Sequence, residues 1–230
     1  MNSENIPTED LKYQLRKMQI KMAEESRSTF LTFVKKVWPE FIAGSHHKII
    51  AKKFEDISRG KIKRLIVNMP PRHTKSEFAS HLFPAWMLGQ KPKLKIIQTT
   101  HTAELSYNFG RKVRNLFDQQ EFKDVYPTVS LSQDSKAAGR FTTNAGGEYF
   151  AAGVGGAITG RGADLRIIDD PHSEQDALSQ TAMDNAYEWY TSGPRQRLQP
   201  GGAIVVVMTR WSTKDLTGKL INAQTNENAD

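Results

Sequence analysis

A short apolar strand that runs through a tight turn into a helix is the feature that most limits how this chain can fold. Residues 64–68 (Arg-Leu-Ile-Val-Asn) are largely β-branched and apolar, which predicts a buried strand, and Pro70 and Pro71 end it. Residues 76–88 follow as a predicted helix, with Pro84 as a kink. Strands that alternate with helices in this way favour an open, mainly parallel sheet covered by helices on both faces.

The loop between this strand and helix, residues 68–76 (Asn-Met-Pro-Pro-Arg-His-Thr-Lys-Ser), ends as a phosphate-binding P-loop does. The pattern G-x-x-x-x-G-K-[ST] has glycines where this chain has Met69 and Thr74, so the motif is incomplete. In a working loop, backbone amides and the helix N-terminus hold phosphate, Lys75 reaches the outer phosphates, and Ser76 ligates Mg²⁺. Taken alone, the loop fits a surface turn with an incidental lysine equally well. The candidate nucleotide-binding residues are Pro71, Arg72, His73, Thr74, Lys75 and Ser76.

A second apolar run, residues 165–170 (Leu-Arg-Ile-Ile-Asp-Asp), ends in two adjacent carboxylates. In P-loop NTPases a strand-end Asp holds Mg²⁺ beside the P-loop hydroxyl. Because the chain turns at the end of a strand, Asp169 and Asp170 can take different roles. We assign Asp169 to the metal, through water, and Asp170 to the attacking water, with Glu174 as the alternative base. The other interpretation is a solvated acidic turn. It is less favoured because the ends of parallel strands converge on one crevice, which would place these carboxylates beside the candidate loop.

A third apolar run, residues 203–208 (Ala-Ile-Val-Val-Val-Met), predicts a strand that is buried on both faces. Thr209 and Arg210 follow it directly. The Thr209 hydroxyl at this position would sense the γ-phosphate or the attacking water. For Arg210, a structural salt bridge and a catalytic role both stay open.

These segments together resemble the ATPase domain of large terminase subunits, the DNA-packaging motors of tailed bacteriophages. The resemblance rests on four motifs in the order of that family: PPRHTKS at 70–76, the glycine-rich segment 153–162, IIDDP at 167–171 and MTRW-x-x-x-DL at 208–216. It runs from about His46 to Leu220. The family usually has a glycine before the P-loop lysine and Asp-Glu after the acidic strand, whereas this chain has Thr74 and a second aspartate.

The resemblance implies an α/β P-loop NTPase of the ASCE type, with an open, mainly parallel sheet, helices on both faces and a small C-terminal lid. It implies a helical arm at residues 1–40, an ATPase core at residues 41–211 and the start of a lid or linker at residues 212–230. Large terminases continue into a nuclease domain, and no second set of strand-borne carboxylates follows here. We therefore expect an ATPase domain, a fragment of a longer protein, without nuclease activity.

The implied activity is hydrolysis of ATP with Mg²⁺ to translocate double-stranded DNA into a procapsid in the host cell cytoplasm. The implied partners are the portal protein and the small terminase subunit, with a homo-oligomeric ring on the procapsid and a monomer in isolation. Arg161 is the single charged residue of the glycine-rich segment, and the resemblance implies that it enters the site of a neighbouring subunit. Arg72 is the competing candidate within the same subunit, and a DNA-phosphate contact or plain surface charge is the third interpretation of Arg161.

Composition agrees with a DNA-handling protein. The formal net charge is +7, and residues 35–64 hold nine Lys or Arg against three acids. Residues 164–188 hold seven acids against one arginine, so acid gathers near the predicted Mg²⁺ site. A basic surface attracts polyanions without regard to sequence. The chain has no cysteine and no apolar run of about 18 residues, so we expect neither disulfides nor a membrane span.

Two other classes of protein share these features. A helicase-like, DNA-remodelling ATPase would use the same loop and acidic strand. A DNA-binding scaffold that hydrolyses nothing would carry the loop as an inactive remnant, because it lacks both glycines.

Overall fold

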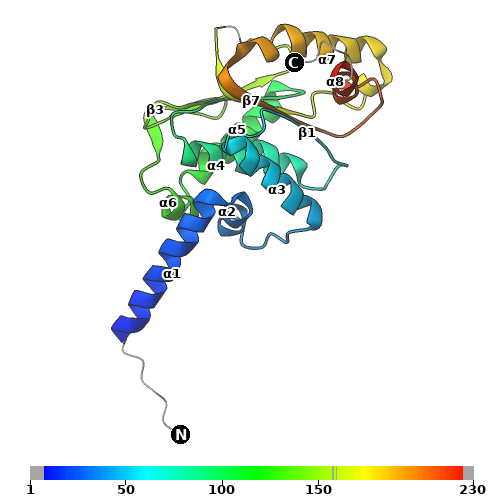
Figure 1. Cartoon of the computed structure of the whole chain (residues 1–230). Helices are drawn as coiled ribbons and strands as arrows, with labels where there is room; N and C mark the ends of the chain where they lie inside the picture. The colour runs from blue at the N-terminus through cyan, green and yellow to red at the C-terminus, as the bar shows by residue number, and fades with distance from the viewer. Residues whose placement is uncertain (1–7, 157, 159, 225–230) are drawn as a thin grey trace.

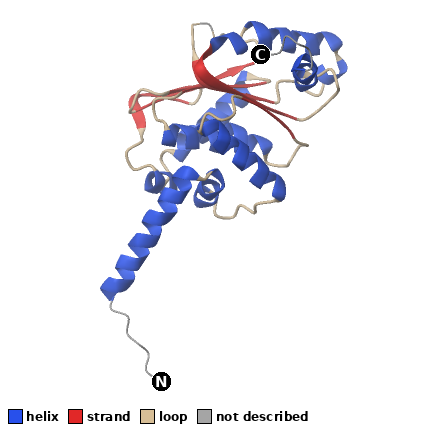
Figure 2. Ribbon diagram, in the orientation of Figure 1, coloured by secondary structure: helices blue, strands red, loops and turns tan. Residues whose placement is uncertain are grey.

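The structure, a computed structural model, describes residues 8–156, 158 and 160–224, and is built around one seven-stranded sheet. Five strands are parallel and the last two are antiparallel. The sheet lies between two layers of helices (Figure 2). In spatial order the strands are β1 (Arg64–Asn68), β7 (Leu198–Met208), β6 (Ala163–Asp169), β2 (Lys95–Thr100), β5 (Glu148–Gly153), β4 (Arg140–Thr143) and β3 (Leu131–Ala137). The predicted α/β class with a mainly parallel sheet is confirmed.

Helices cover both faces of this sheet, with α7 and α8 on one side and α3, α4 and α5 on the other (Figure 1). Their bounds are α1 (Thr8–Ser28), α2 (Phe30–Val37), α3 (Ser45–Ser58), α4 (Phe83–Gln90), α5 (Ala103–Leu116), α6 (Gln120–Val125), α7 (Gln180–Ser192) and α8 (Leu216–Gln224). A π-helix, η1 (Glu77–Leu82), precedes α4, and two short 3₁₀ turns are η2 (Asp176–Leu178) and η3 (Arg195–Arg197). Among the described helices, none is both long and apolar enough to cross a membrane.

The two-fold alternation of β7 explains why its residues 203–208 are all apolar. Val205 and Val207 belong to the large core cluster beneath the sheet, together with α3 and α4. Ile204 and Val206 face the other way and pack with Tyr190 of α7. Because successive side chains of a strand point to opposite faces, a strand covered on both sides must be apolar at every position.

The helix that follows the P-loop differs from the prediction of one regular helix over residues 76–88. It begins as an α-turn at Lys75 and Ser76, widens into the π-helix η1, and returns to α-helical geometry at Phe83. Pro84 lacks an amide hydrogen, and its ring would collide with the carbonyl four residues earlier, so the turns before it open out. The predicted kink at Pro84 therefore takes the form of six residues of π-helix.

Three further segments differ from what the sequence pattern predicts. Turn-forming residues and scattered apolar positions predict turns over residues 127–147, but this segment contains the β3–β4 hairpin, whose edge strand β3 is mostly polar. The spacing of Leu105, Phe109 and Val113 predicts one buried helix face, but Leu105 is 41% exposed and Ser106 is buried instead. The apolar pattern of residues 29–38 predicts a helix against the sheet, but the helix formed there, α2, packs mainly on α1 and α3.

The N-terminal helices follow the expected pattern of helix, interruption, helix. The break falls at Thr29, between α1 and α2. Most of α1 projects away from the rest of the molecule (Figure 1). Its predicted apolar positions Leu11, Leu15, Met18 and Met22 are about half exposed. By contrast, Phe30 of α2 is fully buried among the rings of the core.

Candidate functional site

The carboxyl ends of β1, β7 and β6 lie side by side and bring the predicted motifs together. The register pairs Asn68 of β1 with Met208 of β7, and Val207 with Asp169 of β6. The P-loop begins at the first of these strand ends and is fixed there, because the Met69 amide donates to the carbonyl of Met208 at 3.2 Å. β7 lies between the P-loop strand and the acidic strand, and all three deliver polar groups to one edge of the sheet.

Asp169 lies deepest in the site and is held by two serines. The Ser76 hydroxyl donates to Oδ1 at 3.1 Å, and the Ser80 hydroxyl donates to Oδ2 at 2.6 Å. Asp169 is only 1% exposed. Burial, reinforced by the neighbouring Asp170, outweighs these hydrogen bonds and raises the pKa of Asp169 to about 7. Burial therefore disfavours the ionised form of this carboxylate, and a cation beside it would favour that form.

A bound Mg²⁺ would be such a cation. Mg²⁺ takes oxygen ligands at about 2.0–2.1 Å in octahedral geometry and keeps several waters, so one or two protein oxygens are enough. The Ser76 hydroxyl and the Asp169 carboxylate meet at one point, and both are hard oxygen donors. Across the described part of the chain, no group of three or more His, Cys, Asp or Glu side chains forms a metal cluster. The donors therefore suit a metal shared with phosphates better than a metal held by protein alone.

Asp170 turns away from Asp169 and pairs with the P-loop lysine. Its backbone has φ 41°, in the left-handed region, so the chain reverses immediately after β6. The Asp170 carboxylate lies 2.8 Å from the Lys75 ammonium and accepts from the Thr209 amide at 2.7 Å. Lys75 is only 8% exposed. The second predicted carboxylate thus links the P-loop to the end of β7.

The P-loop adopts two left-handed residues without a glycine at either. Arg72 has φ 63° and Thr74 has φ 60°. Glycine takes this conformation freely, whereas a β-branched residue such as threonine is strained in it. Thr74 occupies the position of the second motif glycine, in a backbone conformation that glycine adopts freely. Threonine in place of that glycine therefore adds strain to the loop.

Other predicted residues are spread more widely. Pro71, Arg72 and His73 are exposed on the loop. Glu174 is also exposed, in the turn after β6.

Arg161 lies at the opposite end of the sheet from Lys75. It precedes β6, pairs with Glu148 at the start of β5 at 2.6 Å, and stacks over the Phe150 ring at 4.2 Å. A strand advances about 3.3 Å per residue, so the length of β6 separates Arg161 from Asp169 by roughly 20 Å or more. Arg161 cannot reach the site of its own chain in this conformation. Residues 157 and 159 of the glycine-rich segment lie outside the described residues.

The segment after β7 is organised by Asp215, the aspartate of the MTRW-x-x-x-DL motif, to which the sequence analysis assigns no role. Its carboxylate accepts from the amides of Trp211, Ser212 and Gly218 at 2.9–3.2 Å. It also pairs with Arg210 at 3.0 Å, so the salt-bridge interpretation of Arg210 describes its contacts. Burial would raise the pKa of Asp215, but these hydrogen bonds outweigh burial and lower it.

Thr217 extends this network to the P-loop strand. Its hydroxyl lies 3.2 Å from both the Asp215 carboxylate and the side-chain oxygen of Asn68. The end of β7, the start of α8 and the end of β1 are therefore tied to one another.

Ser80 and His47 also lie at the site but are not among the predicted site residues. The resemblance gives His47 only as a possible contact to the nucleotide base, and it does not indicate Ser80. Ser80 lies four residues after Ser76, and that spacing on one helix is the signal that both could reach the same carboxylate. His47, in α3, contacts Thr74 through its Nε2. Nothing in the sequence brings His47 to the loop, because α3 precedes β1 and the contact depends on how the two pack.

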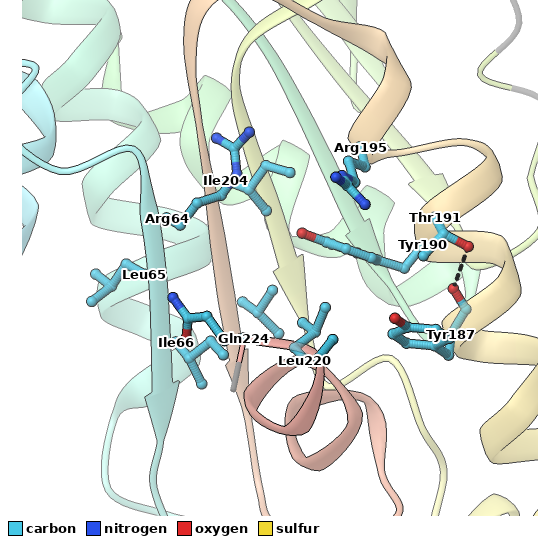
Figure 3. Close-up of a pocket in the computed structure, with 12 residues that line it drawn as sticks. Arg64, Leu65, Ile66, Tyr187, Tyr190, Thr191, Arg195, Ile204, Leu220 and Gln224 are labelled. Atoms are coloured by element: carbon cyan, nitrogen blue, oxygen red, sulfur yellow. Dashed lines mark hydrogen bonds between the residues drawn. The ribbon is translucent and has the colours of Figure 1, made fainter. Parts of the chain in front are cut away.

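A separate apolar pocket lies on the other face of the sheet, between β1, β7, α7 and α8 (Figure 3). Its volume is about 180 Å³, and Ile66, Tyr190 and Leu220 line it together with Arg64. None of its lining residues belongs to the P-loop or to the acidic pair, so this pocket is distinct from the site at the strand ends.

Comparison with known proteins gives a likeness in fold. No protein-family model and no curated protein matches the sequence. Among solved structures, the large terminase of bacteriophage HK97 is similar, with a TM-score of 0.53 and 14% sequence identity. The match covers 89% of this chain and 45% of the HK97 chain, so this chain spans less than half the length of that protein. At this identity the likeness shows a terminase-like α/β fold.

Proposed function

We propose that this chain is the ATPase motor domain of a large terminase, which hydrolyses ATP to drive double-stranded DNA into a procapsid. The observation that carries the proposal is the meeting of Lys75, Ser76, Asp169 and Asp170 at the ends of two parallel strands. A surface turn with an incidental lysine would not bury Lys75 beside a carboxylate pair. The terminase-like fold adds support, because it is the fold in which these motifs would be expected.

In the proposed reaction, the backbone amides from Arg72 to Ser76 and the Lys75 ammonium hold the phosphates of ATP. Ser76 and Asp169 would hold Mg²⁺, which neutralises charge on the phosphates. Asp170 accepts a proton from a water molecule whose oxygen attacks the γ-phosphorus in line. The bond from that phosphorus to the bridging oxygen breaks, leaving ADP and inorganic phosphate. Lys75 and Asp170 must exchange their mutual contact for contacts with phosphate and water before this step.

Thr209 is the proposed link between the site and movement of the segment beyond it. Its amide holds Asp170, and the following residues are fixed by Asp215 and reach Asn68 through Thr217. Binding of the γ-phosphate would release Asp170 from Lys75. Loss of the γ-phosphate would restore that pair and, through Thr209, move the start of α8. We assign residues 212–230 to the start of a lid or linker on this basis, with residues 1–40 as an arm and residues 41–211 as the core.

One of two arginines, Arg161 or Arg72, is proposed to neutralise charge in the transition state. Arg72 lies on the loop itself and would act within one subunit. Arg161 would act on a neighbouring subunit of a ring, because its own site lies at the far end of β6. Glu174 is retained as the alternative to Asp170 as the base. The terminase assignment implies the partners and the location: the portal protein, the small terminase subunit, duplex DNA and the host cytoplasm. If that assignment is wrong, these proposals are wrong too.

The direct test is release of inorganic phosphate from ATP by the purified chain, with and without Mg²⁺ and duplex DNA. The proposal expects Mg²⁺-dependent turnover that Lys75→Ala abolishes. Strand separation of a forked duplex would instead favour the helicase-like ATPase. Nucleotide binding without turnover, under every condition including added DNA, would remove the motor assignment. Absence of both binding and turnover would favour the DNA-binding scaffold.

A further inference from the structure

Thr74 is held in its left-handed conformation by a chain of hydrogen bonds that starts outside the P-loop. The Thr74 Oγ1 lies 2.5 Å from Nε2 of His47 and 2.6 Å from the carbonyl oxygen of His73. A hydroxyl donates one hydrogen and accepts others, so it can accept from His47 while it donates to His73. Both contacts would be lost if the hydroxyl were removed.

The direction of the His47 hydrogen bond follows from its other ring nitrogen. Nδ1 of His47 accepts from the backbone amide of Gly44 at 2.9 Å, at the start of α3. In a neutral imidazole one nitrogen accepts and the other donates, so Nε2 carries the hydrogen. That hydrogen is directed to Thr74, with Nε2 of His46 as a second neighbour at 3.1 Å.

His47 is also fixed in position by its packing. It is 7% exposed, and its ring packs against those of Phe41 at 4.8 Å and Phe78 at 4.9 Å, which also contact each other. Phe78 belongs to the helix that follows the P-loop, so the imidazole packs α3 against that helix. Burial, with further contributions from His46 and His73, lowers the pKa of His47 and favours the neutral ring that this hydrogen-bond pattern requires.

We propose that His47 is a positioning residue of the nucleotide site, which holds Thr74 in the conformation that a glycine would otherwise supply. This proposal rests on the proposed function, because the loop that His47 positions is the one assigned to phosphate binding. In a P-loop with glycine before the lysine, the backbone reaches a positive φ without support. Here a β-branched residue occupies the position, and His47 supplies an external hydrogen bond that favours the strained conformation.

The experiment is a double-mutant cycle between His47 and Thr74, read by calorimetric binding of a non-hydrolysable ATP analogue with Mg²⁺. We expect His47→Ala to weaken binding roughly tenfold, the effect of losing a hydrogen bond that orders the loop. In a Thr74→Gly background the same substitution should change affinity by less than about threefold, because glycine needs no support. An equal loss in both backgrounds would overturn the proposal.

Two further variants separate positioning from packing. Thr74→Val keeps the shape of the side chain and removes only the hydroxyl, so it should weaken binding about as much as His47→Ala. His47→Gln keeps an N–H donor near the position of Nε2 and should restore part of the affinity. If Thr74→Val binds as the wild type does, the hydroxyl is not the link and the proposal fails.

The same double-mutant cycle can be read by the thermal unfolding midpoint of the nucleotide-free chain. This second measurement does not depend on the proposed function. His47→Ala should lower the unfolding midpoint more in the wild-type background than in the Thr74→Gly background. If the wild-type chain binds no nucleotide but the thermal unfolding shows coupling between His47 and Thr74, the proposed function is wrong and the contact between the two residues is still supported. Binding by the wild type, with no coupling in either measurement, would remove the present inference alone.

Discussion

The Lys75 ammonium lies 2.8 Å from the Asp170 carboxylate, so the cation of the P-loop is paired with the group proposed to activate water. The same carboxylate is held by the Thr209 amide, and Asp170 has a left-handed backbone. A nucleotide that draws Lys75 to its phosphates would free one oxygen of Asp170. The pair thus connects phosphate binding to the availability of the base.

Asp170→Asn should separate binding from hydrolysis. The amide removes the ionic partner that Lys75 has in the nucleotide-free chain, so affinity for ATP should stay the same or increase. Turnover should fall by about 10²–10⁴-fold, the contribution expected of a general base. Calorimetry and phosphate release measure the two effects, and Glu174→Gln is the matched control that should retain turnover. Loss of turnover in Glu174→Gln, with activity kept in Asp170→Asn, would exchange the two assignments.

Ser80→Ala should raise the Mg²⁺ concentration that the reaction needs. The Ser80 hydroxyl donates a hydrogen bond to Oδ2 of Asp169, whereas Ser76 contacts Oδ1. Ser80 therefore orients the carboxylate that is the proposed metal ligand. Removal of such an outer hydrogen bond typically weakens metal affinity about 10–100-fold. A Mg²⁺ titration of phosphate release at saturating ATP measures it. Ser58→Ala, which alters a buried serine bonded within α3, should leave the Mg²⁺ titration unchanged.

Asp215→Asn should destabilise the chain in a pH-dependent manner. The buried carboxylate accepts three backbone amides and pairs with Arg210, and the loss should be about 2–4 kcal/mol at neutral pH. Because its folded pKa is below the unfolded value, Asp215 stabilises the fold above the unfolded pKa of about 3.9 and loses this effect as pH falls through the folded pKa. In urea unfolding, the free energy of unfolding of the variant should be well below that of the wild type at pH 7. This difference should become smaller below about pH 4. A difference that does not change with pH would contradict this role.

Arg161→Ala should reduce turnover only in an assembly of several subunits. In one chain the guanidinium is held by Glu148 and Phe150, away from the site. An arginine supplied in trans contributes about 10³–10⁵-fold in rate, so assembled protein should lose most of its activity while the isolated chain keeps its rate. Phosphate release at equal subunit concentration, with and without assembly, measures this. Equal losses in both states would exclude the trans role.

The strand ends could be predicted from the sequence because parallel buried strands are apolar throughout. The runs at 165–170 and 203–208 lie in buried strands, as predicted. The run at 64–68 forms the strand β1, but the prediction that it is buried is wrong, because β1 is the outermost strand of the sheet and its residues are half-buried or exposed. The polar residues that follow the three runs lie together at the carboxyl ends of the strands. The β3–β4 hairpin gave no such signal, since its edge strand carries mostly polar side chains. Local pattern therefore located the site but not the edge of the sheet.

The contacts that depend on packing could not be predicted in the same way. Thr74 was recognised as a departure from the motif, but its φ of 60° and its partner His47 depend on how α3 lies against the loop. Arg161 is only eight positions before Asp169 in sequence, and an extended strand turns that short separation into the length of the sheet. Sequence distance along a strand is a poor guide to proximity.

Calorimetric titration of the wild-type chain and Lys75→Ala with a non-hydrolysable ATP analogue and Mg²⁺ tests most directly whether a P-loop without glycines works. The expected result is saturable binding to one site in the wild type, which depends on Mg²⁺ and weakens at least about tenfold in Lys75→Ala. Binding of equal strength in both proteins, or none in the wild type, would contradict the assignment of this loop as a nucleotide site.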